Sequence, residues 1–154
     1  MNYEAILYEV KDNILTITLN RPDKLNAFNY SMQSDLINAI DKANDDDEVK
    51  AIIVTGAGRG YCAGADLSAG KDTFNMEARD DRKGAISDNG EIDWSHSGVR
   101  DGGGRVTLKM FECLKPIISA CNGPAVGVGL TMQLAMDIRL ASEEAKYGFV
   151  FARR

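Results

Sequence analysis

The chain is poor in the residues that bind metals or form disulfides. It has one histidine, His96, and three cysteines, Cys62, Cys113 and Cys121, which show no Cys-x-x-Cys spacing. An odd number of cysteines without paired spacing argues against both a disulfide framework and a zinc site. We therefore expect no metal centre, and a reducing compartment suits this chain best.

The chain also lacks an excess of positive charge. It carries 18 Lys and Arg against 23 Asp and Glu, a formal net charge of −5. No basic cluster therefore favours RNA, DNA or an anionic membrane as a partner. The start has no basic segment followed by an apolar one, and no apolar run reaches the ~18 residues of a transmembrane helix. We expect a soluble, cytoplasmic protein that acts on small molecules.

What the chain does have is enough apolar sequence for one ordinary domain, since 44% of its 154 residues are hydrophobic. Residues 5–10 and 14–19 are rich in β-branched and apolar side chains and flank an Asp-Asn turn, which predicts a hairpin. Apolar residues then recur at helical spacing over 31–43, with Asn29 or Ser31 as the N-cap.

Two short buried strands, 51–55 and 116–120, each lead into a glycine-bearing turn. Helices are predicted over 106–114 and 130–136, and a further strand over 137–142. Between the halves, residues 68–105 lack sustained periodicity and are expected to form a mobile loop, with the tract 101–104 as a hinge. Trp94 and His96 fall in this loop and are interpreted as surface residues.

The two glycine turns, 60–67 and 122–129, are the candidate functional features. Neither completes a dinucleotide-binding or phosphate-binding glycine motif. Small residues around Gly64 would let a substrate approach the main chain, and Asp66 can cap a following helix. Gly127 would leave the Val128 N–H free to donate to an anion, so one donor from each turn could form an oxyanion hole. Spacing alone fits purely structural tight turns equally well.

Several motifs closely resemble, in order and spacing, the enoyl-CoA hydratase/isomerase family, or crotonase superfamily. The resemblance rests on these stretches: Asn20-Arg21-Pro22-x-x-x-Asn26-Ala27, Gly58-Arg59-Gly60-Tyr61-Cys62-Ala63-Gly64-Ala65-Asp66-Leu67, Lys115-Pro116 and Asn122-Gly123-Pro124-Ala125-Val126-Gly127-Val128-Gly129. It implies an α/β fold, the ββα superhelix of the ClpP/crotonase type, here truncated before the C-terminal helices. It also implies that the full-length protein forms homotrimers or hexamers and binds acyl-CoA thioesters, with no cofactor because coenzyme A is part of the substrate.

The resemblance assigns roles by motif position. The N–H groups of Ala65 and Val128 would hold the thioester oxygen and stabilise an enolate. The positions implied to line the CoA site are Lys24, Asn26, Ala27, Ala63, Gly64, Asp66, Leu67 and Gly127. Lys24 suits a phosphate by its charge, although a solvated lysine explains it equally well.

The chain departs from the family pattern at the catalytic acids. Hydratases of the family carry two glutamates, and the corresponding positions here are Thr131 and, on or near the second, Phe151. Threonine is no base near neutral pH and phenylalanine transfers no proton, so two-glutamate hydration is not supported. Isomerase-type members carry a single carboxylate slightly later, which would fall beyond Arg154.

Two functions remain open at this stage. The leading hypothesis is an acyl-CoA enzyme of the hydratase/isomerase type that stabilises an enolate in a backbone oxyanion hole. The alternative is a non-catalytic acyl-CoA-binding or assembly subunit, suggested by Thr131 and Phe151 where acids are expected.

Overall fold

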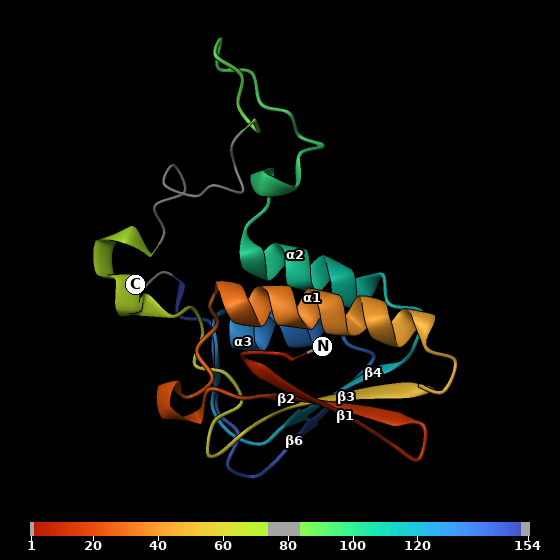
Figure 1. The fold of residues 1–154 in the computed structure, drawn as a ribbon. Coiled ribbons are helices and arrows are strands. Elements are labelled where there is room, and N and C mark those ends of the chain that lie inside the picture. Colours follow the sequence, from red (N-terminus) through yellow and green to blue (C-terminus); the bar gives the residue numbers. More distant parts are fainter. Residues whose placement is uncertain (1, 74–83, 152–154) are drawn as a thin grey trace.

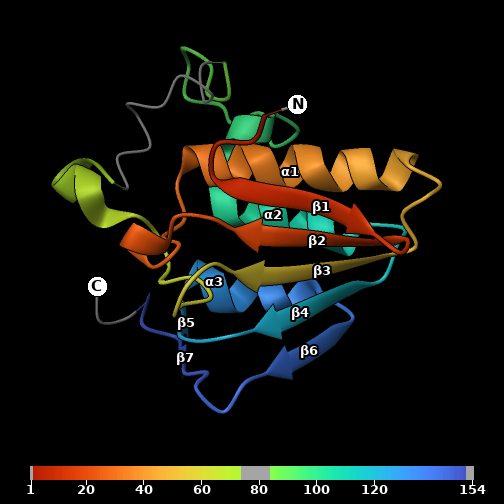
Figure 2. The ribbon, with the colours of Figure 1, turned by 60° about the horizontal axis from the view of Figure 1, so that its bottom comes forward.

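A computed structural model describes residues 2–73 and 84–151 of the chain. Its main element is a five-stranded sheet of order β1-β2-β3-β4-β6. The strands are β1 (Ile6–Lys11), β2 (Ile14–Leu19), β3 (Ala51–Gly56), β4 (Ile117–Cys121) and β6 (Ile138–Ala141). Strands β1 and β2 are antiparallel, and all other neighbours are parallel. The α/β fold class is as predicted, and Figures 1 and 2 show the helices gathered on one face of this sheet.

The predicted hairpin is confirmed, and its turn explains the register. Asp12 and Asn13 both have positive φ, 51° and 63°. Two such residues in succession give the turn whose twist matches that of the flanking strands. Lys11 therefore pairs with Ile14, and the side chains of Leu15, Ile17 and Leu19 alternate into the core with no exposed surface.

Helix α1 (Tyr30–Asp45) covers the sheet and confirms the predicted amphipathic helix. Of the two N-cap candidates, Asn29 is the cap, since its side chain accepts a hydrogen bond of 2.9 Å from the Met32 N–H. The buried residues fall at helical spacing, as burial of one face requires. They are Met32, Gln33, Leu36, Ala39, Ile40 and Ala43.

Helix α2 (Gly102–Phe111) packs beside α1 and begins earlier than predicted. The prediction of a hinge at 101–104 is wrong. Asp101 caps α2 by accepting a hydrogen bond from the Gly104 N–H, and the three glycines form the first turn of this helix. They fit there because α1 lies close, and a Cβ added to Gly102 would stand 2.1 Å from the Gln33 Oε1. The predicted loop thus ends at residue 101, and 74–83 of it lie outside the described residues, so its mobility stays a prediction.

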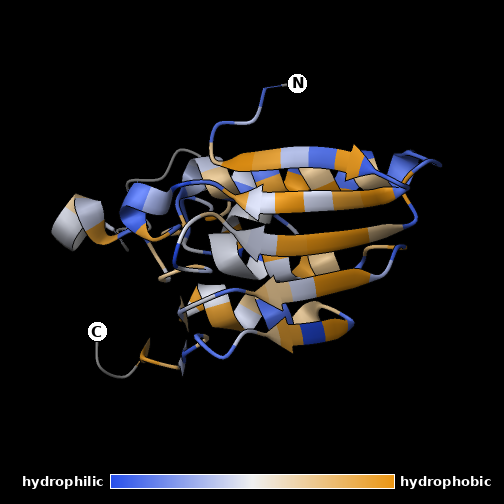
Figure 3. Ribbon diagram, turned by 90° about the horizontal axis from the view of Figure 1, so that it is seen from below, coloured by the Kyte–Doolittle hydropathy of each residue, from blue (hydrophilic) through white to orange (hydrophobic). Residues whose placement is uncertain are grey.

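The remaining described elements are two to six residues long. They are the short helices η1 (Pro22–Lys24), η2 (Leu67–Asp72), η4 (Ser97–Val99), α3 (Val128–Thr131) and η5 (Met132–Ala135), and the paired strands β5 (Ala125–Val126) and β7 (Tyr147–Gly148). Strands β3 and β4 are apolar over most of their length (Figure 3) and run parallel. Their carboxyl ends therefore meet at one edge, and the two glycine turns leave the sheet there.

Candidate active site

The two glycine turns lie directly against each other. Cys62 forms a parallel bridge with Ala125, and the Val126 N–H donates to the Cys62 carbonyl oxygen over 2.9 Å. The turns approach so closely that a Cβ added to Gly129 would stand 2.3 Å from that same oxygen. Only glycine fits such a contact. The predicted meeting of the two turns is therefore confirmed.

Each turn presents a backbone N–H that has no partner in the described parts of the chain. Ala65 follows Gly64 (φ 94°) and Val128 follows Gly127 (φ 54°), so a positive-φ glycine precedes both amides. Phe28 pairs with the groups on either side of Ala65, accepting from the Asp66 N–H and donating to the Gly64 carbonyl. No hydrogen bond is found from the N–H of Ala65 or of Val128 to another described residue. The two amides are thus available to a ligand.

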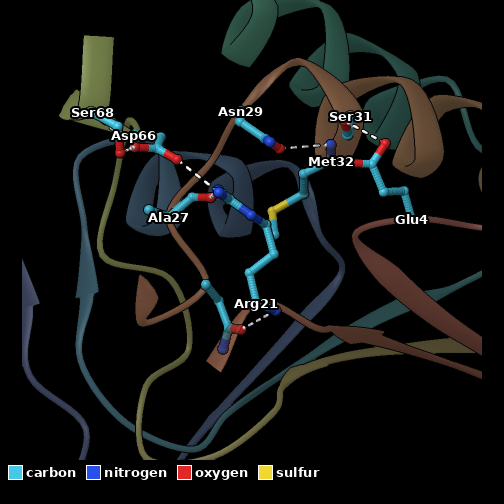
Figure 4. Close-up of polar contacts among 9 residues, drawn as sticks. Glu4, Arg21, Ala27, Asn29, Ser31, Met32, Asp66 and Ser68 are labelled. Atoms are coloured by element: carbon cyan, nitrogen blue, oxygen red, sulfur yellow. Dashed lines mark hydrogen bonds and ion pairs between the residues drawn. The ribbon is translucent and has the colours of Figure 1, made fainter. Parts of the chain in front are cut away.

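Asp66 is held by the protein itself, as Figure 4 shows. Its carboxylate accepts from the Ser68 N–H and hydroxyl, which confirms its predicted capping role, and lies 2.8 Å from Arg21 Nη2. The hydrogen bonds from Ser68, followed by the one from Arg21, lower the pKa of Asp66 to about 2. Arg21 also donates to the Ala27 carbonyl oxygen over 2.5 Å. This pair therefore ties the loop after β2 to the first glycine turn.

Asn26 also supports the site from within. Its side chain is fully buried, accepts from the Arg21 N–H and donates to the Ala57 and Gly60 carbonyl oxygens over 2.8 to 2.9 Å. All its polar atoms are engaged by backbone, so its side chain has no surface to offer a CoA moiety. We conclude that Asn26 shapes the loop that precedes the turn.

Of the other predicted CoA positions, Gly127 lies in the second glycine turn, and the rest fall on the loop after β2 and on the first glycine turn. Lys24 is exposed in η1, while Ala27 is buried and its carbonyl oxygen is bound to Arg21. Ala63 donates its N–H to the Leu25 carbonyl oxygen over 3.0 Å, and Leu67 is 46% exposed. The structure thus brings 24–28 and 63–67 together, and a CoA contact at these positions stays a prediction.

A cavity of about 390 Å³ adjoins the second turn. Its lining residues are Asp101, Gly103, Gly104, Thr107, Leu108, Val128, Thr131 and Phe151. Thr131 and Phe151, the two positions where the family resemblance places acids, therefore face one space next to Val128. Sequence reasoning missed the contribution of α2, although an aspartate ahead of an amphipathic segment is a helix-start signal.

Several other reactive or aromatic side chains are buried, make local contacts or lie on the surface. Burial raises the pKa of the Cys62 thiol to about 11 and also raises that of the Tyr61 hydroxyl. His96 accepts from the Gly98 N–H, and Trp94 is 71% exposed. Among the described residues no cluster of His, Cys, Asp or Glu could hold a metal, and no helix there is long and apolar enough to cross a membrane.

Comparisons with known proteins agree with this geometry. The family model described as enoyl-CoA hydratase/isomerase matches residues 9–153. An enoyl-CoA hydratase of Alternaria alternata is 39% identical over 93% of this chain and 42% of its own length. The 1,2-epoxyphenylacetyl-CoA isomerase of Escherichia coli is 34% identical over 97% of this chain and 52% of its own.

Solved structures give the same result. A crystal structure of a putative enoyl-CoA hydratase from Streptomyces coelicolor superposes with a TM-score of 0.78 at 28% identity, covering 99% of this chain and 50% of that one. An enoyl-CoA hydratase/isomerase from Xanthobacter autotrophicus gives a TM-score of 0.73 at 33% identity, covering 96% and 49%. The chain therefore spans about half the length of the relatives it matches, and its fold is that of the crotonase superfamily, N-terminal portion. On this evidence the chain belongs to the enoyl-CoA hydratase/isomerase family.

Proposed function

We propose that this chain binds an acyl-CoA thioester and stabilises its enolate with the N–H groups of Ala65 and Val128. The observation that carries the proposal is that both amides lack partners in the described residues although their turns are in direct contact. Unpaired donors held by a rigid backbone are what a developing oxyanion requires. The cavity beside Val128 offers room for the acyl group.

The reaction class follows from the residues that line the cavity. Thr131 and Phe151 cannot supply the two carboxyl groups of a hydratase, so we favour isomerisation or a related enolate reaction over two-glutamate hydration. Coenzyme A enters as part of the substrate and no separate cofactor is involved. The names of the relatives are consistent with more than one reaction in the family, since one is a hydratase and another an isomerase.

Replacement of Val128 by proline tests the assignment. Val128 is the first residue of α3, a position that tolerates proline, and the change removes the proposed donor. Loss of one oxyanion donor should cost on the order of 3 kcal/mol of transition-state stabilisation, roughly a hundredfold in rate. Turnover of a trans-2-enoyl-CoA and a 3-enoyl-CoA, followed by absorbance of the conjugated thioester, provides the measurement.

The matched control is Val128→Ala, which keeps the N–H and removes only the side chain. We expect near-normal turnover in this variant, and circular dichroism should show both variants folded. Equal turnover of a folded Val128→Pro variant and the wild type would refute the role of Val128.

A non-catalytic acyl-CoA-binding or assembly subunit is the second candidate, favoured by Thr131 and Phe151 at the acid positions. Calorimetric titration with butyryl-CoA separates the two. Binding without turnover of either enoyl-CoA would support the subunit, whereas no binding would reject both functions.

We also propose assembly into homotrimers or hexamers. Several large apolar side chains are exposed towards the end of the chain, as expected of a surface that is covered in an oligomer. They are Leu114, Leu134, Ile138, Leu140 and Phe149. Sedimentation equilibrium tests this proposal, and a monomer at all concentrations would contradict it.

A further inference from the structure

Among the described residues that line the cavity beside Val128, one has an ionisable side chain. That side chain is the carboxylate of Asp101. Thr131 offers a hydroxyl, while Phe151, Leu108 and the glycines offer nothing. Enolate formation requires a base as well as an oxyanion hole. Asp101 is therefore the group to examine.

The Asp101 carboxylate is fixed at one oxygen and free at the other. Oδ1 accepts from the Gly104 N–H over 2.9 Å, as the cap of α2. Oδ2 has no hydrogen-bond partner within the described residues. The glycine at 104 leaves room beside this oxygen, since a Cβ added to Gly104 would stand only 3.0 Å from Oδ2. A capping role alone occupies only one oxygen, so the second remains available for proton transfer.

The start of α2 also lies directly against the second glycine turn. A Cβ added to Gly103 would stand 2.7 Å from Val128 Cγ2, so the backbone next to Asp101 touches the residue that carries the proposed donor. Thr107 holds this turn of α2 in place by donating its hydroxyl to the Gly103 carbonyl oxygen over 2.9 Å. The packing thus keeps Asp101 and Val128 on the same cavity.

We infer that Asp101 is the catalytic base of this site, an inference that rests on the proposed function. Its Oδ2 removes a proton from the α-carbon of the bound thioester. The electron pair of the broken C–H bond moves into the C1–C2 bond, and the thioester oxygen becomes the oxyanion held by Ala65 and Val128. Return of the proton to the γ-carbon of a 3-enoyl thioester moves the double bond to C2, so no further reactant is consumed.

The test follows exchange of the α-protons of butyryl-CoA in D₂O by proton NMR, because exchange needs only the base and the oxyanion hole. The variant Asp101→Asn keeps an oxygen that can cap α2, since asparagine is as good an N-cap as aspartate. We expect exchange to fall about 100-fold or more, the contribution of a general base. Calorimetric affinity for butyryl-CoA should be unchanged.

Two further variants separate catalysis from structure. Asp101→Ser also preserves the cap without a carboxylate and should lose exchange to the same extent. Asp41→Asn removes a carboxylate that pairs with Lys109 of α2 and does not line the cavity, so exchange should persist at the wild-type rate.

Each outcome is decisive. Wild-type exchange in folded Asp101→Asn would overturn the inference while leaving the oxyanion hole intact. A wild-type protein that binds butyryl-CoA without exchanging its α-protons would also overturn it and would favour the binding subunit. No binding would reject the proposed function itself, and with it the inference.

Discussion

Replacement of Gly129 by alanine tests the contact that holds the two glycine turns together. Gly129 lies in α3, where alanine would normally stabilise a helix by about 1 kcal/mol. Its added Cβ, however, would stand 2.3 Å from the Cys62 carbonyl oxygen, against about 3.3 Å for an ordinary carbon–oxygen contact. The turns must therefore separate by about 1 Å, which strains the 2.9 Å hydrogen bond from Val126 to Cys62.

Overpacking of this kind costs about 1–3 kcal/mol and loss of the hydrogen bond about 1 kcal/mol, so we expect a net loss of about 2 kcal/mol despite the helix preference of alanine. Urea unfolding followed by circular dichroism measures this loss, and butyryl-CoA α-proton exchange should fall with it. Gly127→Ala is the comparison without a close contact, because its Cβ would meet nothing closer than 3.8 Å. Its cost of about 1–3 kcal/mol comes only from a backbone conformation, φ 54° and ψ −122°, that L-residues rarely adopt. A Gly129→Ala variant at least as stable as the wild type would refute the close contact.

The remaining predictions concern the support of the site. Asn26→Ala should lower the free energy of unfolding by about 2–4 kcal/mol in urea titrations, because it leaves the buried Gly60 carbonyl and the partly buried Ala57 carbonyl without their donor; a loss below about 1 kcal/mol would contradict this role. The folded pKa of Asp66 is about 2 and its ordinary value is 3.8. The contribution of its ionised carboxylate to the free energy of unfolding is therefore complete above pH 4 and is lost as the pH falls towards 2. Solvent screening limits this contribution to about 1 kcal/mol. The difference in unfolding free energy between the wild type and Asp66→Asn should therefore shrink as the pH falls from 4 towards 2. A difference that does not change with pH would contradict this prediction. The side chain of Leu36, on the buried face of α1, has no exposed surface, so Leu36→Ala should lower the free energy of unfolding by about 3 kcal/mol in the same titration. An unchanged urea midpoint would refute its burial.

Much of the fold could be predicted because its signals are local. The Asp12-Asn13 turn specifies the hairpin through backbone conformations that these two residues tolerate, and β-branched runs identify β3 and β4. Since both strands are parallel, their following turns had to meet at one edge of the sheet. The positions of Ala65 and Val128 follow from that meeting.

What could not be predicted depends on tertiary contacts. Three successive glycines have poor helix propensity, yet 102–104 form the first turn of α2, where α1 leaves no room for a side chain at Gly102 and α3 leaves none at Gly103. The place of Asp101 on the cavity follows from this packing and from no local pattern. Likewise, Asn26 is buried where three backbone groups from two segments meet, one from the loop after β2 and two from the turn after β3.

The central claim is that Ala65 and Val128 donate to the thioester oxygen, and backbone amide NMR tests it most directly. Titration of ¹⁵N-labelled protein with butyryl-CoA should move the amide protons of these two residues downfield, as expected when a free N–H gains a hydrogen-bond acceptor. Saturable binding that leaves both resonances in place would contradict the account.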